Sequence, residues 1–278
     1  MKQFILNETP DPGGRIRISG EDYHYLVHVR RFAPGSVFTA LLPGGGQVRI
    51  RVLAVDKRCL IGECGALPPS GEIPPSADIQ RPVQAEFRAA KAQLPPIYLF
   101  QALPKGVKMD LIVRQAAEGG VAGIVPFVSD HGVSRLAPER AEERLARWRR
   151  IIKEARQQSG SEAATQIEAP RDVDGLLARW EELRSRRPRA VGLLFHQDTL
   201  EQGCFHGYLD RDPDLAAALI GPEGGFSPEE LTRFKAAGFM PLVMGDTVLR
   251  VETAAVYATA AIRIILWERM SWMLKTPR

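Results

Sequence analysis

Along residues 1–66, apolar and polar positions alternate in short runs that are separated by turns. In the run 47–55, Val48, Ile50 and Val52 occupy every second position, and polar residues, among them two arginines, lie between them. One face of such a strand packs inward and the other faces solvent. Similar runs lie at 15–18, 37–42 and 59–62, with Pro-Gly and Gly-Gly-Gly turns between strands. This spacing predicts a small β-barrel.

A short helix is predicted at 21–31, with Tyr25 or Leu26 and also Val29 buried. The segment 67–96 contains seven prolines and few large apolar residues, which is typical of a linker with one short helix at most. We therefore predict three parts. They are a barrel at 1–70, a proline-rich linker at 71–96 and a second domain at 97–278.

Strand-like and helical periodicities alternate after residue 96. The apolar run 97–103 predicts a buried strand, residues 105–119 repeat apolar side chains at helical spacing, and 121–128 is again strand-like. A strand, a helix and a strand in this order predict a right-handed parallel unit. The same patterns predict helices at 138–158, 174–184 and 252–270, and strands at 190–195, 215–220 and 239–244.

The strand predicted at 215–220 runs into a Gly-Pro-Glu-Gly-Gly turn and then into a well-specified helix start. Ser227 is expected to cap this helix, with Pro228 at the first position and Glu230 at the third. The Ser227 side chain then accepts a hydrogen bond from the Glu230 amide, and the Glu230 carboxylate accepts one from the Ser227 amide. The glycines allow positive φ and a close approach by a ligand.

Two interpretations of this turn are open. It is either a tight strand-to-helix connection or a ligand site, because open α/β sheets bind ligands where their strands end. It lacks the Lys-Ser/Thr pair of a P-loop and the Gly-x-Gly-x-x-Gly spacing of a dinucleotide fold, so neither a nucleoside triphosphate nor NAD is expected. Two further turns, at His196 and at 244–249, also follow strands. The three are predicted to converge at one sheet edge and to form a pocket.

Composition narrows the class of protein. Of the 278 residues, 45% are apolar, which suffices for a real core. Lys and Arg outnumber Asp and Glu by 37 to 33, and the pI near 9.1 permits a polyanionic partner. Three cysteines outside any repeated Cys-x-x-Cys pattern favour a reducing compartment and argue against a metal site. Without a signal-like start or a long apolar run, we expect a cytoplasmic protein with no membrane partner.

The two glycine-bearing turns together are similar to those of a known family. The sequence contains Ile220-Gly-Pro-Glu-Gly-Gly-Phe-Ser and, about twenty residues later, Met244-Gly-Asp-Thr-Val-Leu-Arg-Val-Glu-Thr-Ala254. This pair resembles the RsmE family, the 16S ribosomal RNA uridine-N3 methyltransferases of the SPOUT superfamily. Further blocks at 21–35, 105–126 and 147–160 extend the resemblance over nearly the whole chain.

The resemblance implies an α/β fold with a C-terminal, SPOUT-type parallel-sheet methyltransferase domain that contains a trefoil knot, preceded by a PUA-like β-barrel. It also implies S-adenosyl-L-methionine bound at the knot, a homodimer whose interface completes the site, and ribosomal RNA or the small ribosomal subunit as partner. Without the resemblance, we would predict an ordinary doubly wound sheet, because protein chains in general do not thread through loops. The implied cofactor-binding residues are Phe195, His196, Ile220, Gly221, Glu223, Gly224, Gly225, Met244, Gly245, Val248 and Leu249.

Methyl transfer to uridine N3 requires a stabilised anion and a proton acceptor. Arg250 is the predicted stabilising group, because a guanidinium is always charged and offers planar donors to uracil O2 or O4. The N3 proton passes to Glu252, to Glu223 or to solvent. For Glu252 the alternative is a carboxylate that the dipole favours at the N-terminus of the last helix.

RNA contacts are predicted for Arg15, Arg17, His24, Arg31 and Lys105. Basic side chains would hold phosphates while an unpaired target loop is splayed open. For each of these residues alone, a solvated charged surface is the alternative. The arginines of the helix at 138–158 are interpreted as a solvated face, because several acidic residues lie among them.

Four positions depart from the family pattern. His131, Ser161 and Thr247 stand where arginine is usual, and Gly119 stands where leucine is usual. The cofactor turns are intact, so cofactor binding is better supported than the identity of the RNA target. Two alternatives are kept: an RNA-binding protein with the knotted fold and no catalysis, and a related knotted methyltransferase that acts on another RNA or on a ribose hydroxyl.

Overall fold

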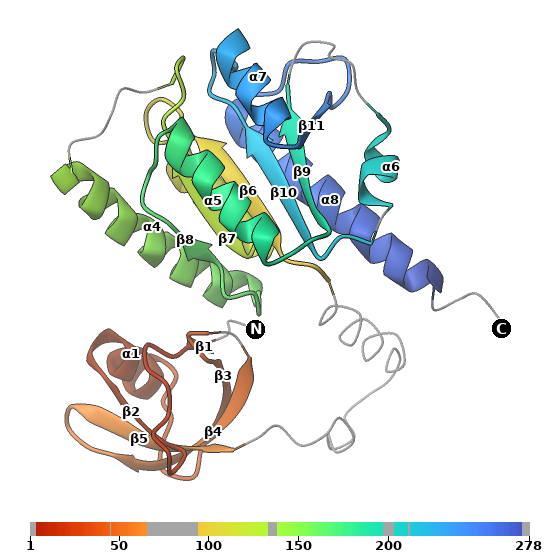
Figure 1. The fold of residues 1–278 in the computed structure, drawn as a ribbon. Helices are drawn as coiled ribbons and strands as arrows, with labels where there is room; N and C mark the ends of the chain where they lie inside the picture. Colours follow the sequence, from red (N-terminus) through yellow and green to blue (C-terminus); the bar gives the residue numbers. More distant parts are fainter. Residues whose placement is uncertain are drawn as a thin grey trace. The chain divides into compact units, whose positions relative to one another are not determined.

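The computed structural model describes residues 4–44, 46–65, 94–132, 138–196, 203–210 and 212–273. These residues form two compact units, Met1–Gln80 with Arg156–Ala164, and Arg81–Ala155 with Thr165–Arg278. Each unit has its own sheet (Figure 1). Most of the linker predicted at 71–96 lies outside the described residues, so the predicted domain boundaries stay a prediction.

The first unit is built on a curled five-stranded sheet (Figure 1). Its neighbours are antiparallel except for β1 and β3, which run parallel. All strands predicted from the alternation are present, whereas β1 is too short to show a pattern. In the sheet order, the strands are β1 (Phe4–Ile5), β3 (Val37–Leu41), β4 (Gln47–Val55), β5 (Cys59–Gly65) and β2 (Arg15–Ser19).

The helix of this unit differs from the prediction in its second half. α1 (Gly20–His24) continues into a π-helical turn, η1 (Tyr25–Val29). Leu26 is buried as predicted, but Val29 is 58% exposed, so the predicted burial of Val29 is wrong. A π-helix closes its hydrogen bonds from residue i to i+5, and this wider turn moves Val29 off the face that Leu26 occupies.

The second unit contains a six-stranded sheet in which all neighbours run parallel, as the sequence predicts. Its strands carry almost unbroken apolar sequences because helices cover both faces. β10 shows this most clearly, since all six of its residues are buried. In sheet order, the strands are β11 (Phe239–Leu242), β9 (Ala190–Phe195), β10 (Leu215–Ile220), β6 (Ile97–Ala102), β7 (Gly123–Phe127) and β8 (Gln166–Ile167).

Helices pack on both faces of this sheet (Figure 1). All the predicted helices are present, while the short elements α6 and β8 have no clear sequence pattern. One face carries α3 (Lys108–Glu118), α4 (Pro138–Ser159), α6 (Phe205–Leu209) and α8 (Val251–Met273). The other carries α5 (Val173–Ser185) and α7 (Pro228–Ala236).

The start of α7 has the cap that the sequence predicts. Ser227 Oγ accepts from the Glu230 amide at 3.1 Å, and the Ser227 amide donates to Glu230 Oε2 at 2.9 Å. Pro228 lies at the first helical position. This capping box fixes where the β10–α7 turn ends.

α8 is the longest helix of the described residues, with 23 residues, and it packs against β6 and β10. Its alanines allow this close packing, since Ala255 and Ala258 are 2% and 0% exposed. Neither α8 nor any other described helix is both long and apolar enough to span a bilayer.

Candidate functional site

Three turns meet at the sheet edge where the parallel strands end. They follow β9, β10 and β11, which are neighbours in the sheet order β11-β9-β10. With the start of α8 they enclose a pocket of roughly 630 Å³ that is free of protein atoms, solvent at its mouth included. The carboxyl ends of parallel strands are where open α/β sheets bind small molecules. The predicted convergence of the three turns is thus observed.

The structure brings most of the residues predicted for the cofactor to this pocket. The Gly-Pro-Glu-Gly-Gly turn contributes through its first and last glycines, and the turn after β11 contributes through its apolar side chains. Three of the predicted residues do not line the pocket, namely Glu223, Gly224 and Gly245. The eight that do are Phe195, His196, Ile220, Gly221, Gly225, Met244, Val248 and Leu249.

Six further residues line the pocket that the sequence analysis did not assign to the cofactor. Most are direct neighbours of predicted residues, so extending each turn by a residue finds them. Val251 and Ala254 are harder to find, because apolar residues at a helix start are normally assigned to the core. The six are Pro222, Phe226, Val243, Thr247, Val251 and Ala254.

Aromatic rings and glycines shape the pocket wall. The rings of His196 and Phe226 stack with centroids 6.5 Å apart and 17° between their planes. A Cβ added to Gly221 would lie 3.2 Å from Phe226 Cε2, so the backbone here passes close to the ring. Gly225 and Gly245 have φ of +70° and +85°, which L side chains rarely adopt. The glycines therefore decide the shape of the wall.

Glu223 does not line the pocket and instead binds one lysine side chain and a backbone amide. Its carboxylate accepts from Lys108 Nζ at 2.6 Å and from the Lys105 amide at 3.2 Å. Partial burial raises the pKa of Glu223, but the hydrogen bonds from Lys108 and from backbone amides outweigh it and hold the pKa below its usual value. Glu223 thus ties the β10–α7 turn to the start of α3.

The lowered pKa of Glu223 sets the sign of a pH effect. A carboxylate with a depressed folded-state pKa stabilises the fold above its unfolded pKa of about 4.3, and this contribution is lost as pH falls through the folded-state pKa. Glu223→Gln should therefore lower the free energy of unfolding by up to about 1 kcal/mol at pH 7. In urea titrations, the stabilities of wild type and variant should converge as the pH falls through the folded-state pKa of Glu223. A constant offset at every pH would contradict this assignment.

Behind the turn lies a buried polar cluster centred on Glu230, which is 2% exposed. Besides the Ser227 amide, the Glu230 carboxylate accepts from Ser129 Oγ and from the Asp130 amide, both at 3.0 Å. Ser227 Oγ also donates to Asp130 Oδ2 at 2.6 Å. The cluster fastens the segment after β7 to the turn after β10. Neighbouring His131 packs on the same turn, since a Cβ at Gly224 would lie 3.0 Å from His131 Cβ.

The predicted catalytic residues lie next to the pocket but do not line it. Arg250 is exposed and directly follows Leu249, and its carbonyl accepts from the Ala254 amide at 2.8 Å to start α8. Glu252 is half-buried in the first turn of α8. Its Oε2 is shielded from solvent and accepts no hydrogen bond from the described residues.

The predicted RNA contacts are exposed, and they belong to both units. Arg15 and Arg17 lie on the outer face of β2, where Arg15 is paired in register with Glu63 of β5. His24 is at the end of α1, and Arg31 has φ of +56° just after η1. Lys105 is in the second unit. Of the departures from the family pattern, Thr247 lines the pocket and Ser161 is buried.

Comparison with known proteins agrees with this fold and pocket. Residues 91–263 match the model of the family described as RNA methyltransferase domain. The ribosomal RNA small subunit methyltransferase E of Mycobacterium bovis is 26% identical over 269 residues, which cover 94% of this chain and 91% of that protein. The protein of the same name from Aquifex aeolicus is 31% identical over 173 residues, 60% of this chain and 68% of that protein.

Among solved structures, the ribosomal RNA small subunit methyltransferase E of Neisseria gonorrhoeae, bound to S-adenosyl methionine, superposes with a TM-score of 0.71. Its sequence is 24% identical, and the match covers 95% of this chain and 98% of that one. The fold, the pocket and the family model together define an α/β RNA methyltransferase. Within that class, the chain belongs to the ribosomal RNA small subunit methyltransferase E (RsmE) family.

Proposed function

We propose that the protein transfers a methyl group from S-adenosyl-L-methionine to N3 of a uridine in small-subunit (16S) ribosomal RNA. The observation that carries this proposal is the pocket at the ends of β9, β10 and β11 in a chain of the RsmE family. The similar protein from Neisseria gonorrhoeae is a small-subunit methyltransferase bound to S-adenosyl methionine. Because its proposed substrate is ribosomal RNA, we also propose a cytoplasmic location.

The pocket walls fit this cofactor. Apolar side chains such as Leu249, Val248 and Ile220 suit an adenine ring, and the glycines leave backbone amides and carbonyls open to hydrogen bonding. When bound, S-adenosyl-L-methionine supplies a methyl group that is activated by a positively charged sulfur. The residues that would hold it are the predicted Phe195, His196, Ile220, Gly221, Gly225, Met244, Val248 and Leu249, with Phe226 and Thr247 added.

Arg250 is positioned to act on the nucleobase. It follows Leu249 of the pocket wall, and its side chain is exposed where a uridine would arrive. Its guanidinium would donate to a uracil carbonyl oxygen and stabilise the negative charge that N3 acquires. Such an interaction is stronger in the transition state than with the neutral base, and it therefore accelerates the reaction.

Glu252 fits the role of proton acceptor better than Glu223 does. The Glu223 carboxylate is held by Lys108 and by the Lys105 amide, and its lowered pKa makes it a weak base. The Oε2 atom of Glu252 is shielded and has no hydrogen-bond donor among the described residues, an arrangement that is costly unless a function uses it. Solvent remains the alternative acceptor.

A homodimer is part of the proposal. α8 exposes Tyr257 and Ile264 by 59% and 56%, and Val248 in the preceding turn is 76% exposed. Tyr257 and Ile264 are seven residues apart and therefore share one helix face. An apolar face beside the pocket is suited to a second copy, which would cover Val248 and the pocket mouth. We further propose the trefoil knot of the resemblance for residues 97–278, and a PUA-like role in RNA binding for the first unit with Arg15, Arg17, His24 and Arg31.

A substitution at Gly221 tests the pocket. In Gly221→Ala, the new Cβ would meet the Phe226 ring at 3.2 to 3.4 Å, so this ring of the pocket wall must shift by a few tenths of an ångström. Overpacking of this kind costs about 1–3 kcal/mol, and the Kd for S-adenosylmethionine should rise roughly tenfold in calorimetry. Gly207→Ala is the control, because the nearest atom to its added Cβ lies 3.8 Å away. An unchanged Kd for Gly221→Ala would remove Gly221 from the site.

The proposed reaction is tested on ribosomal RNA from a strain with and without the protein. Mass spectrometry of nucleosides from 16S RNA should show 3-methyluridine that depends on the protein. An unchanged level of 3-methyluridine would reject the uridine-N3 assignment, and a different lost methyl nucleoside would identify another target. Calorimetry with purified protein tests the alternative of an RNA-binding protein without catalysis, because such a protein would not bind S-adenosylmethionine.

A further inference from the structure

The middle of α4 presents four cations within two helical turns. Arg147, Arg149 and Arg150 are exposed and Lys153 is half-buried, and we call these four the α4 strip. The opposite face of the helix is anchored in the core by side chains that include Trp148 and Ile152, which are 1% and 5% exposed. The cations are therefore carried by a fixed element that does not need to fold when a partner binds.

Carboxylates compensate little of the charge of Arg149 and Arg150, the two arginines at the centre of the strip. Arg147 pairs with Asp110 of α3 at 2.5 Å. Arg150 approaches Glu154 at 3.9 Å, with side chains 73% and 64% exposed, a geometry that contributes little. Arg149 forms no ion pair with any described residue. Between residues 147 and 155, Glu154 is the only acidic residue of the sequence against four cations.

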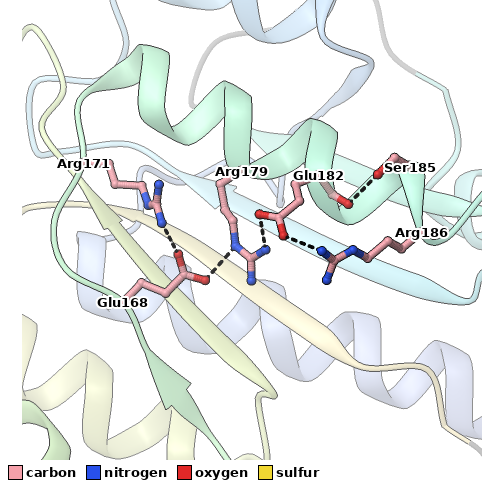
Figure 2. A network of polar contacts seen from close by, with 6 residues as sticks. All are labelled: Glu168, Arg171, Arg179, Glu182, Ser185 and Arg186. Carbon is pink, nitrogen blue, oxygen red and sulfur yellow. Dashed lines mark hydrogen bonds and ion pairs between the residues drawn. The ribbon is translucent and has the colours of Figure 1, made fainter.

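α5 on the other face of the sheet shows what a compensated surface looks like. Figure 2 shows Arg179 held between Glu168 and Glu182, with Arg171 and Arg186 on the same two carboxylates. Residues 168–187 contain five arginines and five acidic residues, so the net charge of this surface is zero. Both helices are rich in arginine, but only the α4 strip retains charge for a polyanion.

Two ion pairs connect the α4 strip to the pocket turn through the first turn of α3. Glu223 of that turn binds Lys108 Nζ at 2.6 Å, and Lys108 lies with Asp110 in the first turn of α3. Asp110 in turn binds Arg147, and its Oδ1 accepts from Trp148 Nε1 at 3.1 Å. Two ion pairs, Glu223–Lys108 and Asp110–Arg147, therefore link the pocket turn to the first residue of the strip. The other residues of the strip follow along α4.

We propose that the α4 strip binds the phosphate backbone of the RNA substrate, on the stretch of chain next to the target nucleotide. This rests on the proposed function, because it takes RNA as the substrate. Phosphate contacts supply most of the sequence-independent affinity for a nucleic acid, and they position the substrate without reading its sequence. Arg149 and Arg150 are the expected centre of the contact, since their guanidinium groups can bind phosphate in a bidentate manner.

The test is the salt dependence of binding to 16S RNA transcribed in vitro. The variant is R149E/R150E in the full chain, and the control is R140E/R144E. The control makes the same charge change in the same helix, in a segment (140–146) where two arginines are balanced by two glutamates. R149E/R150E should weaken binding roughly tenfold at low salt and lower the slope of log K against log salt by about 1–2. The control should bind like wild type.

Two further measurements separate the possible failures. The melting temperature and the Kd for S-adenosylmethionine should be unchanged in R149E/R150E, because neither residue is buried or lines the pocket. If R149E/R150E and the control bind RNA like wild type while wild type methylates 16S RNA, the α4 strip proposal is overturned and the proposed function stands. Equal weakening in both variants also overturns it, since the effect would then be one of net charge alone. A wild-type protein that neither binds nor methylates 16S RNA overturns both proposals.

Discussion

Replacing Arg250 by alanine is expected to lower kcat for methyl transfer by about 10²–10³-fold, the usual effect of removing one preorganised donor to a developing anion. The side chain is exposed and outside the pocket wall, so the Kd for S-adenosylmethionine should not change. Single-turnover transfer to 16S RNA, measured with labelled cofactor, reports the chemical step. Calorimetry reports binding on the same preparation.

Two controls keep the Arg250 result specific. Arg250→Lys retains the charge and loses the planar fork, so it should recover part of the rate. Asp246→Asn changes an exposed charge in the same turn and should transfer methyl at the wild-type rate. Full activity of Arg250→Ala with normal cofactor binding would refute the catalytic assignment. A loss of cofactor binding in Arg250→Ala would place the residue in the cofactor site instead.

Glu230→Gln is expected to lower the free energy of unfolding by about 2–3 kcal/mol, because it breaks a buried charged network. The wild-type carboxylate accepts from the Ser227 and Asp130 amides and from Ser129 Oγ. A glutamine side chain offers only one acceptor oxygen. Its NH2 group would face groups that themselves donate hydrogen bonds in the wild type. Chemical denaturation measures the change, and Glu229→Gln, an exposed neighbour, should stay within about 0.5 kcal/mol of wild type.

The Glu230 network also has a predicted effect on the site. It fixes Ser227, and Phe226 of the pocket wall is the residue before Ser227. Glu230→Gln should therefore raise the Kd for S-adenosylmethionine even at temperatures where the variant is fully folded. A stable variant with wild-type affinity would show that the cap is not needed to hold the pocket.

Local pattern in the sequence predicts much of this fold. The capping box of Ser227 and Glu230 needs only residues three apart, and it is present as predicted. The long apolar strands and amphipathic helices are likewise found, because their period is visible within one element. β1 and β8 are two residues each, and such short segments carry no period. Strand order depends on contacts between residues that are distant in the sequence, and periodicity within one element does not show it.

In the site too, some features are visible in the local sequence and others depend on contacts between distant residues. The two glycine motifs identify the turns, and eight of the residues predicted for the cofactor line the pocket. The environment of Glu223 is not visible in the sequence, since its partner Lys108 is 115 residues away. The role of Phe226 as pocket wall depends on its proximity to Gly221 and His196 in space. Spacing along the chain therefore locates the pocket, while the direction of each side chain comes from tertiary packing.

The position of β10 in the sheet also has a consequence for how the chain folds during synthesis. β10 pairs with β6 on one side and β9 on the other, and Ala216 lies opposite Ile97. At roughly 5–20 residues per second, the ribosome completes β10 roughly 6–24 s after β6. During this time one edge of β6 has no partner, and an unpaired apolar edge is a template for aggregation. The strand order that gathers three turns around one pocket thus leaves the nascent chain most vulnerable at β6.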